Sequence, residues 1–367
     1  MNARILLIAI FFFMAGCSDS GDDSGFAGLA ESVPSPSDNG GFLQPGPDVG
    51  ISLPEDFGPH PRYRVEWWYL TANLVTPSGA PLGLQWTQFR QGFRPRDPAE
   101  APEPDSWSLD AAWMAHAAVS WRDRHWFAER LARADTGAAG AEAQPLDVWL
   151  DDWELKAVSG TTWQLNVRSH KPAAAFRYDL TLTLRGKPVL HGQNGFSAKS
   201  DSGEGSMYFS LVDIDIRGTV TIEDNTIPVT GQGWFDREWS SQFLKRGQQG
   251  WDWFALHLDS GDKLMAFRLR GEDQTFVSGT WIPEEGSPQA LGNEDLSLAI
   301  LDSRDGYPVR WHIEVPGHNL DLQVAAPPGR YVNEGRFPYW ESPVQVEGNR
   351  TGVGYMELTG YASGDTP

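Results

Sequence analysis

The most regular feature of the sequence is an alternation of side-chain character with a period of two. Residues 65–72 and residues 82–87 both alternate, and a Pro-Ser-Gly turn at 77–79 lies between them. This period places successive side chains on opposite faces of an extended strand, and a turn with glycine between two such runs is typical of a hairpin. The sequence therefore predicts a β-hairpin over residues 65–87.

The same pattern recurs further along the chain. Residues 180–184 and 220–222 alternate before polar turns, and residues 253–268 form two apolar arms around an Asp-Ser-Gly-Asp turn. One stretch, residues 129–134, could form one or two helical turns, and no segment has the apolar spacing of a long helix. Short strands with regular glycine and proline between them predict an all-β protein made of barrels or sandwiches.

The length of 367 residues favours two domains. The hairpins that begin near Glu66 and near Trp251 share an aromatic first arm, a glycine-containing turn and an apolar second arm. This likeness is a hint of internal duplication, although any two β-hairpins resemble each other. We expect a first domain over residues 51–241 and a second over residues 242–367.

The N-terminus has the order of a bacterial lipoprotein signal. Arg4 precedes an apolar run over residues 5–13, and a small-residue stretch ends at Cys17. The run is too short to span a bilayer, and small residues before a cysteine are typical of a cleavage site. We expect residues 1–17 to be a lipoprotein signal with an acylated Cys17; the alternative is a secretory signal with an incidental cysteine. An acyl anchor would hold the chain in the cell envelope, and Ser18 favours the outer membrane, facing the periplasm.

Residues 18–50 separate this signal from the first predicted strand. They are rich in Ser, Gly, Asp and Pro, and they contain six acidic residues and no basic residue. Because they show no sustained hydrophobic period, we expect a disordered tether between the anchor and the folded body.

Composition excludes several classes of function. The formal net charge is −20, and a surface that binds nucleic acid needs basic side chains, so nucleic acid is not expected as a partner. A single cysteine cannot form an internal disulfide or a cysteine-rich metal site. The sequence has no G-x-S-x-G, H-E-x-x-H, P-loop or G-x-G-x-x-G motif, and its eight histidines are scattered. We therefore expect no metal and no cofactor.

Carboxylates between aromatic residues are the main candidates for chemistry. Residues 234–241 read Trp-Phe-Asp-Arg-Glu-Trp-Ser-Ser, so on a strand Asp236 and Glu238 share one face while Arg237 and Trp239 share the other. Charged groups avoid apolar surroundings unless they are paired or transfer protons. The two acids are therefore either catalytic groups or members of buried ion pairs with Arg237.

Two histidines lie near similar segments. His60 precedes the run Glu66-Trp67-Trp68-Tyr69, and His116 lies between alanines in residues 114–118. Both are candidates for a functional role, and a hydrogen-bonded core histidine is the alternative at His116.

Five segments together carry a family resemblance: residues 66–74 (EWWYLTANL), 236–241 (DREWSS), 251–254 (WDWF), 339–341 (YWE) and 360–361 (GY). They resemble the AttH/CrtC-type lipocalin-like proteins, which include predicted secreted hydrolases and carotenoid 1,2-hydratases, also called hydroxyneurosporene synthases. The resemblance runs from about residue 51 to residue 361. It implies two lipocalin-like β-barrel domains with an apolar cavity near their junction.

The resemblance also implies where a site would lie. In the hydratase branch a histidine stands between the aspartate and the tryptophan of the second segment and serves in acid catalysis. This chain has Arg237 there, and arginine cannot donate a proton at ordinary pH. The Tyr and Asp expected on the following strand are replaced by residues 264–268. Only Asp236 and Trp239 match, so carotenoid hydration is not carried over to this chain.

Two functions are consistent with these observations. In the first, the chain is a hydratase or hydrolase of an apolar lipid or isoprenoid-like ligand, and its catalytic residues are Asp236, Glu238, Glu66 and His116. The ligand-binding side chains expected for it are Trp239, Trp234, Tyr69, Trp68, His60 and Arg237. In the second, the chain is a non-catalytic lipocalin-like carrier for a lipid or isoprenoid, or a binding protein associated with a membrane transporter, for which an ABC-type transporter is the candidate partner. A purely structural envelope protein is a third possibility and predicts no cavity.

Overall fold

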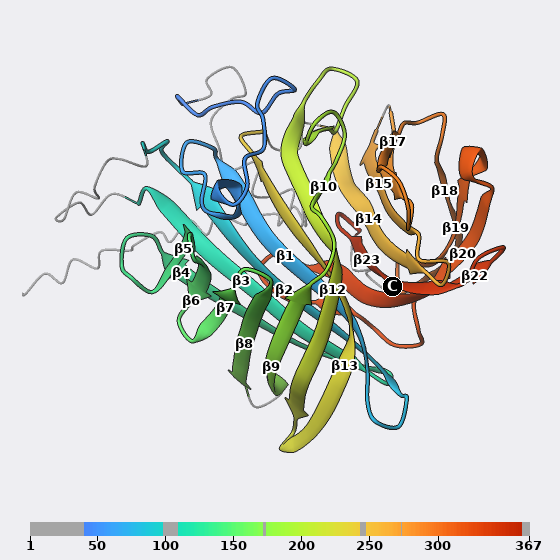
Figure 1. Ribbon diagram of the computed structural model, residues 1–367, viewed down its shortest axis with the longest axis horizontal. Helices are drawn as coiled ribbons and strands as arrows, with labels where there is room; N and C mark the ends of the chain where they lie inside the picture. Colours follow the sequence, from blue (N-terminus) through green and yellow to red (C-terminus); the bar gives the residue numbers. More distant parts are fainter. Residues whose placement is uncertain (1–39, 98–108, 172–173, 243–246, 273, 362–367) are drawn as a thin grey trace, which may run out of the picture.

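The computed structural model describes residues 40–97, 109–171, 174–242, 247–272 and 274–361. Within these residues the chain is built almost entirely of β-strands (Figure 1). Their helical elements are two single turns, η1 (Glu55–Phe57) and η2 (Pro316–His318). Neither is long enough to cross a bilayer, and the described residues contain no other helix. The all-β prediction is confirmed.

The first sheet has 13 strands and curls into a nearly closed barrel. Its strands are β1 (Val65–Val75), β2 (Pro81–Gly92), β3 (Ala111–Trp121), β4 (Arg124–Arg133), β5 (Ala139–Ala143), β6 (Leu146–Leu150), β7 (Trp153–Ser159), β8 (Thr162–Lys171), β9 (Ala174–Leu184), β10 (Val189–Leu190), β11 (Phe196–Ala198), β12 (Gly205–Ile222) and β13 (Asn225–Ser240). The order is β4-β3-β2-β1-β13-β12-β9-β8-β7-β6-β5, with β10 and β11 also paired to β12. Because β4 contacts β6 and β9, the two edges of the sheet approach each other.

The second sheet has ten strands and forms a half-barrel. Its strands are β14 (Gln248–Leu258), β15 (Lys263–Gly271), β16 (Phe276–Ile282), β17 (Gln289–Leu291), β18 (Ser297–Arg304), β19 (Tyr307–Val315), β20 (Leu320–Ala325), β21 (Val332–Asn333), β22 (Tyr339–Gly348) and β23 (Gly352–Leu358). Figure 1 shows the two sheets side by side, the first from blue to yellow and the second from light orange to red. The two barrel-like domains that the sequence predicts are confirmed.

The predicted hairpins are present. β1 and β2 pair from Val65↔Gln91 to Val75↔Pro81, and Gly79 closes their turn at a φ of +78°. Residues 129–134 are expected as a possible helical turn, but residues 129–133 continue β4, which pairs with β3 over its whole length, and Ala134 begins the turn that follows. The helical prediction was wrong. Trp126 and Ala128 point into the core with the period of two that a strand has, and this alternation begins before residue 129.

Four hydrophobic clusters organise the described residues, and the fourth, around Trp239, packs against the segment before β1. The first fills the barrel of the first sheet and includes Trp68, Leu70 and Trp153; the second fills the half-barrel around Trp311. A third cluster lies between the sheets, where Tyr69, Tyr208 and Trp234 meet Trp253, Phe267 and Tyr355. In this region β1 lies against β23 and β2 against β22. The central strands of the first sheet are therefore covered on both faces.

The folded body begins earlier than the sequence suggested. Phe42 is buried, with the guanidinium of Arg64 4.5 Å from its ring centroid, and the Leu43 N–H donates to the carbonyl of Arg62 at 2.9 Å. Val49 packs against the cluster around Trp239. Residues 40–50 are thus part of the fold and not of a tether, because Phe42 is buried and Val49 is partly buried against the body, although Leu43 is exposed. Cys17 and residues 18–39 lie outside the described residues.

One glycine marks a close approach of β13 to β1, and its replacement should destabilise the fold. A Cβ at Gly231 would stand 2.1 Å from the carbonyl oxygen of Asn73 and 2.8 Å from Leu74 Cα. We expect Gly231→Ala to lower the free energy of unfolding by about 1–3 kcal/mol, as measured by urea denaturation. Gly160→Ala is the control, since nothing lies within 4 Å of its Cβ position. Equal stability of both variants would contradict the close approach.

Candidate active site between the two sheets

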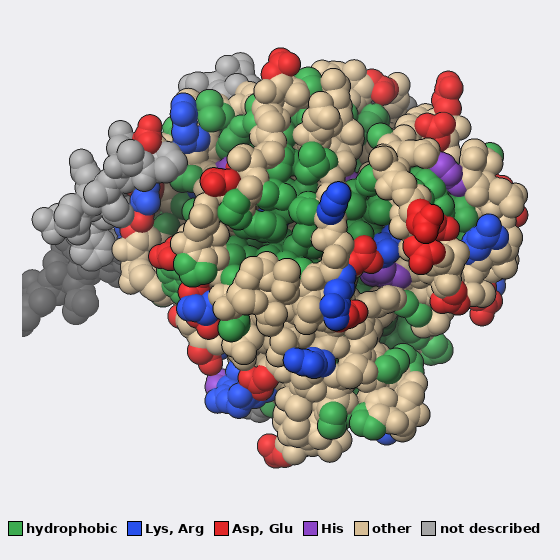
Figure 2. Space-filling view, in the orientation of Figure 1, with side chains coloured by type: hydrophobic (Ala, Val, Ile, Leu, Met, Phe, Trp, Pro, Cys, Tyr) green, Lys and Arg blue, Asp and Glu red, His purple; other side chains and the backbone are tan. Residues whose placement is uncertain are grey.

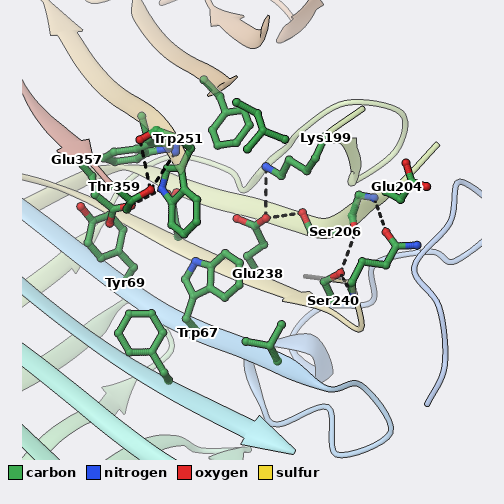
Figure 3. A pocket seen from close by; sticks show the side chains of 18 of the residues that line it. Trp67, Tyr69, Lys199, Glu204, Ser206, Glu238, Ser240, Trp251, Glu357 and Thr359 are labelled. Atoms are coloured by element: carbon green, nitrogen blue, oxygen red, sulfur yellow. Dashed lines mark hydrogen bonds and ion pairs between the residues drawn. The ribbon is translucent and has the colours of Figure 1, made fainter. Parts of the chain in front are cut away.

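A cavity of about 170 Å³ lies between the two sheets. Most of its surface is aromatic or aliphatic, and its polar groups are concentrated on β13, on the residues between β11 and β12, and on β23 (Figure 3). The side chains that line the cavity include Trp67, Tyr69, Lys199, Ser206, Asp236, Glu238, Trp251, Trp253, Phe267, Tyr339 and Glu357. Figure 2 shows hydrophobic side chains gathered in a hollow near the middle of the face that it presents. An apolar cavity with few polar groups is the usual form of a ligand site.

Asp236 is the most strongly held polar group of this cavity. Its Oδ1 accepts hydrogen bonds from Trp234 Nε1 at 2.7 Å and from the hydroxyl of Ser210, and its Oδ2 accepts one from Tyr208 at 2.8 Å. An indole N–H only donates, so the bond of 3.2 Å from Trp253 Nε1 to the Tyr208 oxygen makes Tyr208 direct its own proton at Asp236. The carboxyl group is therefore fixed in orientation by both sheets.

The protonation of Asp236 is poised near neutral pH. Burial raises its pKa to about 7, while the hydrogen bonds from Ser210, Tyr208 and Trp234 lower it and the charge of Glu238 adds to the rise. A carboxyl group in this range holds a proton in a large share of molecules at pH 7 and can give or take one. This is the arrangement that general acid–base chemistry requires.

Glu238 lies beside Asp236 on the same face of β13 but in a different environment. It accepts a hydrogen bond from Ser206, and Lys199 Nζ lies 3.3 Å from its Oε1 (Figure 3). The ammonium of Lys199 also lies 4.3 Å from the ring centroid of Phe267. The two acids of β13 therefore face the cavity with different partners, hydroxyl and indole donors at Asp236 and an ammonium and a hydroxyl group at Glu238.

His116 reaches the cavity only through another residue. Its Nδ1 lies 3.0 Å from the hydroxyl of Tyr339, which lines the cavity, and its Nε2 lies 3.1 Å from Glu129. Burial lowers the pKa of His116, against the hydrogen bond and charge of Glu129. His116 and Tyr69 belong to one cross-strand row, because both are in register with Thr87. His116 thus positions Tyr339 and does not touch a ligand in the cavity.

The remaining candidates lie on the opposite face of the first sheet. Glu66 and Arg237 form an ion pair with no exposure to solvent, and Arg90 adds a second cation. Burial alone would raise the pKa of Glu66, but Arg90, Arg237 and the hydrogen bond from His60 hold it well below its usual value. The guanidinium carbon of Arg237 lies over the ring of Trp68, 3.8 Å from the ring centroid.

This group also fixes the N-terminal segment of the body. Arg237 donates to the carbonyl of Gly58 at 2.5 Å, and the backbone N–H of His60 donates to Glu66 at 2.9 Å. The imidazole of His60 stacks on Trp239, with ring centroids 3.8 Å apart and planes at 7°.

Of the ten candidate side chains, Asp236, Glu238 and Tyr69 line the cavity. Trp234 and His116 lie behind its wall, where they contact the lining residues Asp236 and Tyr339. The other five belong to the separate cluster on the opposite face: Glu66, Trp68, His60, Arg237 and Trp239.

The sequence reasoning missed two carboxyl groups on the second sheet. Glu357 of β23 lines the cavity, and Glu341 of β22 is fully buried beside it as its cross-strand partner. The runs Tyr339-Trp340-Glu341 and Tyr355-Met356-Glu357 read as ordinary final strands. The signal was nevertheless present, since an acid between aromatic and apolar residues is the criterion that selected Asp236.

One group of side chains among the described residues could hold a metal ion. His312 Nε2 lies 2.9 Å from Asp321, and His312 Nδ1 lies 3.8 Å from Glu314. The three residues are on β19 and β20, partly or fully exposed, and none of them lines the cavity. This group is therefore separate from the cavity.

Comparisons with known proteins agree with this architecture. The model of the AttH-like family matches residues 44–361. An AttH of Nitrosomonas europaea has a crystal structure with a TM-score of 0.76 and 29% sequence identity, and the match covers 88% of this chain and 100% of that one. No protein of curated function matches the sequence significantly.

Two more distant structures share the fold. Kievitone hydratase from Nectria haematococca has a TM-score of 0.63 and 15% identity, over 88% of this chain and 97% of that one. CghA, solved with Sch210972, has a TM-score of 0.51 and 14% identity over the same shares. At this level of identity the likeness concerns the fold alone.

The Glu66 cluster predicts a large stability effect. Arg237→Met leaves Glu66 buried with one guanidinium in place of two, and removing one partner of a buried pair costs about 3–5 kcal/mol in the free energy of unfolding. Urea denaturation measures this loss. Arg217→Met, at an exposed position of β12, should change stability by about 0.5 kcal/mol or less. If the two variants were equally stable, the cluster would not hold the fold.

The position of Asp236 predicts a pH-dependent effect on stability. With a raised pKa, Asp236 binds more protons in the folded than in the unfolded chain between pH 3.8 and about 7, so wild-type stability falls as pH rises through this window. Asp236→Asn removes this dependence. The stability of the variant relative to wild type should therefore increase by roughly 1.4 kcal/mol per pH unit within the window. A difference that stays constant from pH 4 to pH 8 in urea denaturation would contradict the raised pKa.

Proposed function

The chain belongs to the AttH-like family, and from this membership and the cavity chemistry we propose that it is a hydratase. In this proposal the chain adds water to a carbon–carbon double bond of an apolar lipid or isoprenoid-like ligand held between the two sheets. The observation that carries the proposal is Asp236, a carboxyl group with a pKa of about 7 in the wall of an aromatic cavity. The shared fold with a hydratase adds support of a coarser kind.

Hydration of an isolated double bond begins with proton transfer to carbon, which requires a neutral acid close to the ligand. The protonated form of Asp236 meets this need, since burial keeps a large share of the carboxyl group neutral at pH 7. A positive charge then develops on the second carbon. The indole faces of Trp67, Trp251 and Trp253 on the cavity wall are suited to stabilise such a charge.

Hydrolysis by a serine nucleophile fits the arrangement less well. Ser210 has a histidine partner, His191, with 2.6 Å between Oγ and Nε2. Both side chains have no exposure, however, and neither lines the cavity. Burial, with the charge of Lys199, lowers the pKa of His191 to about 3, so His191 is a weak base. The pair orients Asp236 and does not present a nucleophile to the ligand.

We also propose that the chain is anchored by an acylated Cys17 in the outer membrane, facing the periplasm. The support is the order of basic, apolar and small residues before Cys17. A ligand that is itself lipid-soluble would reach a protein tethered at a membrane directly or from an ABC-type transporter. Metabolic labelling with a fatty acid should mark the wild-type chain and not Cys17→Ser.

The hydratase proposal predicts a specific loss of turnover. Full-length wild-type chain, given geranylgeraniol as an isoprenoid probe in ¹⁸O-labelled water, should form a diol whose new hydroxyl group carries ¹⁸O. Asp236→Asn should lower this rate by about 100-fold or more, the contribution typical of a positioned acid. Asp302→Asn, at an exposed position of β18, is the matched control and should keep the rate.

Two results would contradict the proposal. One is a rate in Asp236→Asn equal to that of wild type. The other is binding of the probe without any ¹⁸O product, which would identify the chain as a lipid carrier, the second function that the sequence allows.

A further inference from the structure

A second acid faces the cavity from the sheet opposite Asp236. Glu357 lies on β23 of the second sheet, while Asp236 lies on β13 of the first, and both line the same cavity. Glu357 Oε1 accepts a hydrogen bond of 2.5 Å from Trp251 Nε1 (Figure 3). The figure also shows that the Glu357–Trp251 contact stands apart from the Glu238–Lys199 contact. A ligand between the sheets would therefore have Asp236 on one side and Glu357 on the other.

Glu341 determines which carboxyl group of the second sheet carries the charge. Burial and the nearby charge of Glu357 raise the pKa of Glu341 well above its usual value, against a hydrogen bond of 2.7 Å from Tyr69. Its Oε2 has no hydrogen-bond partner among the described residues. A neutral Glu341 leaves Glu357 as the member of the pair that ionises.

Glu357 itself is poised near neutrality. Burial raises its pKa to about 7, opposed by the hydrogen bond of Trp251 and assisted by the charges of Asp236 and Glu238. The groups that face it are thus Asp236 and Glu238 on β13, Trp251 on β14, Tyr339 and Glu341 on β22, and Tyr69 on β1. Two mutually repelling carboxyl groups of similar pKa favour states in which one is protonated and the other ionised.

Glu238 is less suited than Glu357 to accept a proton on the side of the cavity opposite Asp236. Its carboxylate is engaged by Lys199 and by the hydroxyl of Ser206. It also lies on the same strand and face as Asp236, so it would approach the ligand from the same side. Glu357 has one hydrogen bond to the indole of Trp251, and no ion pair is found for it in the described part of the chain.

We propose that Glu357 is the catalytic base that deprotonates the attacking water, and that H and OH consequently add to opposite faces of the double bond. This inference rests on the proposed hydratase function. Asp236 gives its proton to one carbon, the water oxygen bonds to the other carbon, and Glu357 takes a proton from that water. The ligand gains one H and one OH, Asp236 becomes ionised and Glu357 neutral. Exchange of a proton with solvent restores the starting state.

The protonation state of Glu357 can be measured without a substrate. The ¹³C resonance of its carboxyl carbon, assigned with Glu357→Gln in full-length chain, should titrate near pH 7. Asp236→Asn should shift this titration to lower pH, because a negative charge across the cavity is removed. Glu347→Gln, at an exposed position of β22, is the control and should leave it unchanged. An ordinary glutamate titration below about pH 5, or no effect of Asp236→Asn, would overturn the inference.

Measurements of turnover distinguish a failure of the Glu357 proposal from a failure of the hydratase proposal. With geranylgeraniol carrying ¹³C in one terminal methyl group, hydration in D₂O should place D and OD on opposite faces, and Glu357→Gln should lower the rate by about 100-fold. If Asp236→Asn is inactive but Glu357→Gln keeps full rate, or if addition occurs on one face, Glu357 is not the base and the hydratase function stands. If Asp236→Asn also keeps full rate, the proposed function fails with it.

Discussion

The proton affinity of the cavity's carboxyl groups depends on their desolvation between two aromatic sheets. The first sheet presents Asp236 and the second presents Glu357 to a shared cavity, and burial is the largest influence on the pKa of both. Buried charges are costly unless they are paired, so acids kept in such a place without a cation are unusual. The packing of Tyr69, Tyr208 and Trp234 against Trp253 and Phe267 maintains this environment.

Strand β13 serves two purposes through its two faces. Asp236 and Glu238 point into the cavity, whereas Arg237 and Trp239 point away from it. The ion pair of Arg237 with Glu66 ties β13 to β1, and its bond to Gly58 ties both to the segment before β1. The position where related hydratases are expected to carry an acid-catalytic histidine is therefore occupied here by a residue that stabilises the sheet.

The fold was largely predictable from the sequence, because the period of two determines which side chains share a face. The alternation over residues 65–87 became β1 and β2, and the motifs around Glu66 and Asp236 correctly indicated the AttH-like family. The faces of β13 were also correctly assigned. The sequence could not show which face meets the second sheet, since that depends on contacts between residues more than a hundred positions apart. For the same reason Glu357, which faces Asp236 from β23, was not found. Arg90 is a different case, because it lies only 24 positions from Glu66 and is its cross-strand partner in the predicted hairpin, so the hairpin register pairs the two residues.

The proposed chemistry requires that Asp236 holds a proton in a large share of molecules at neutral pH. The most direct measurement is the pH titration of its carboxyl ¹³C resonance in full-length chain labelled at aspartate, assigned with Asp236→Asn. The account predicts a midpoint of about 7. A midpoint below about 5, in the ordinary range of aspartate, would contradict it, because Asp236 would then be ionised at neutral pH and unable to protonate a ligand.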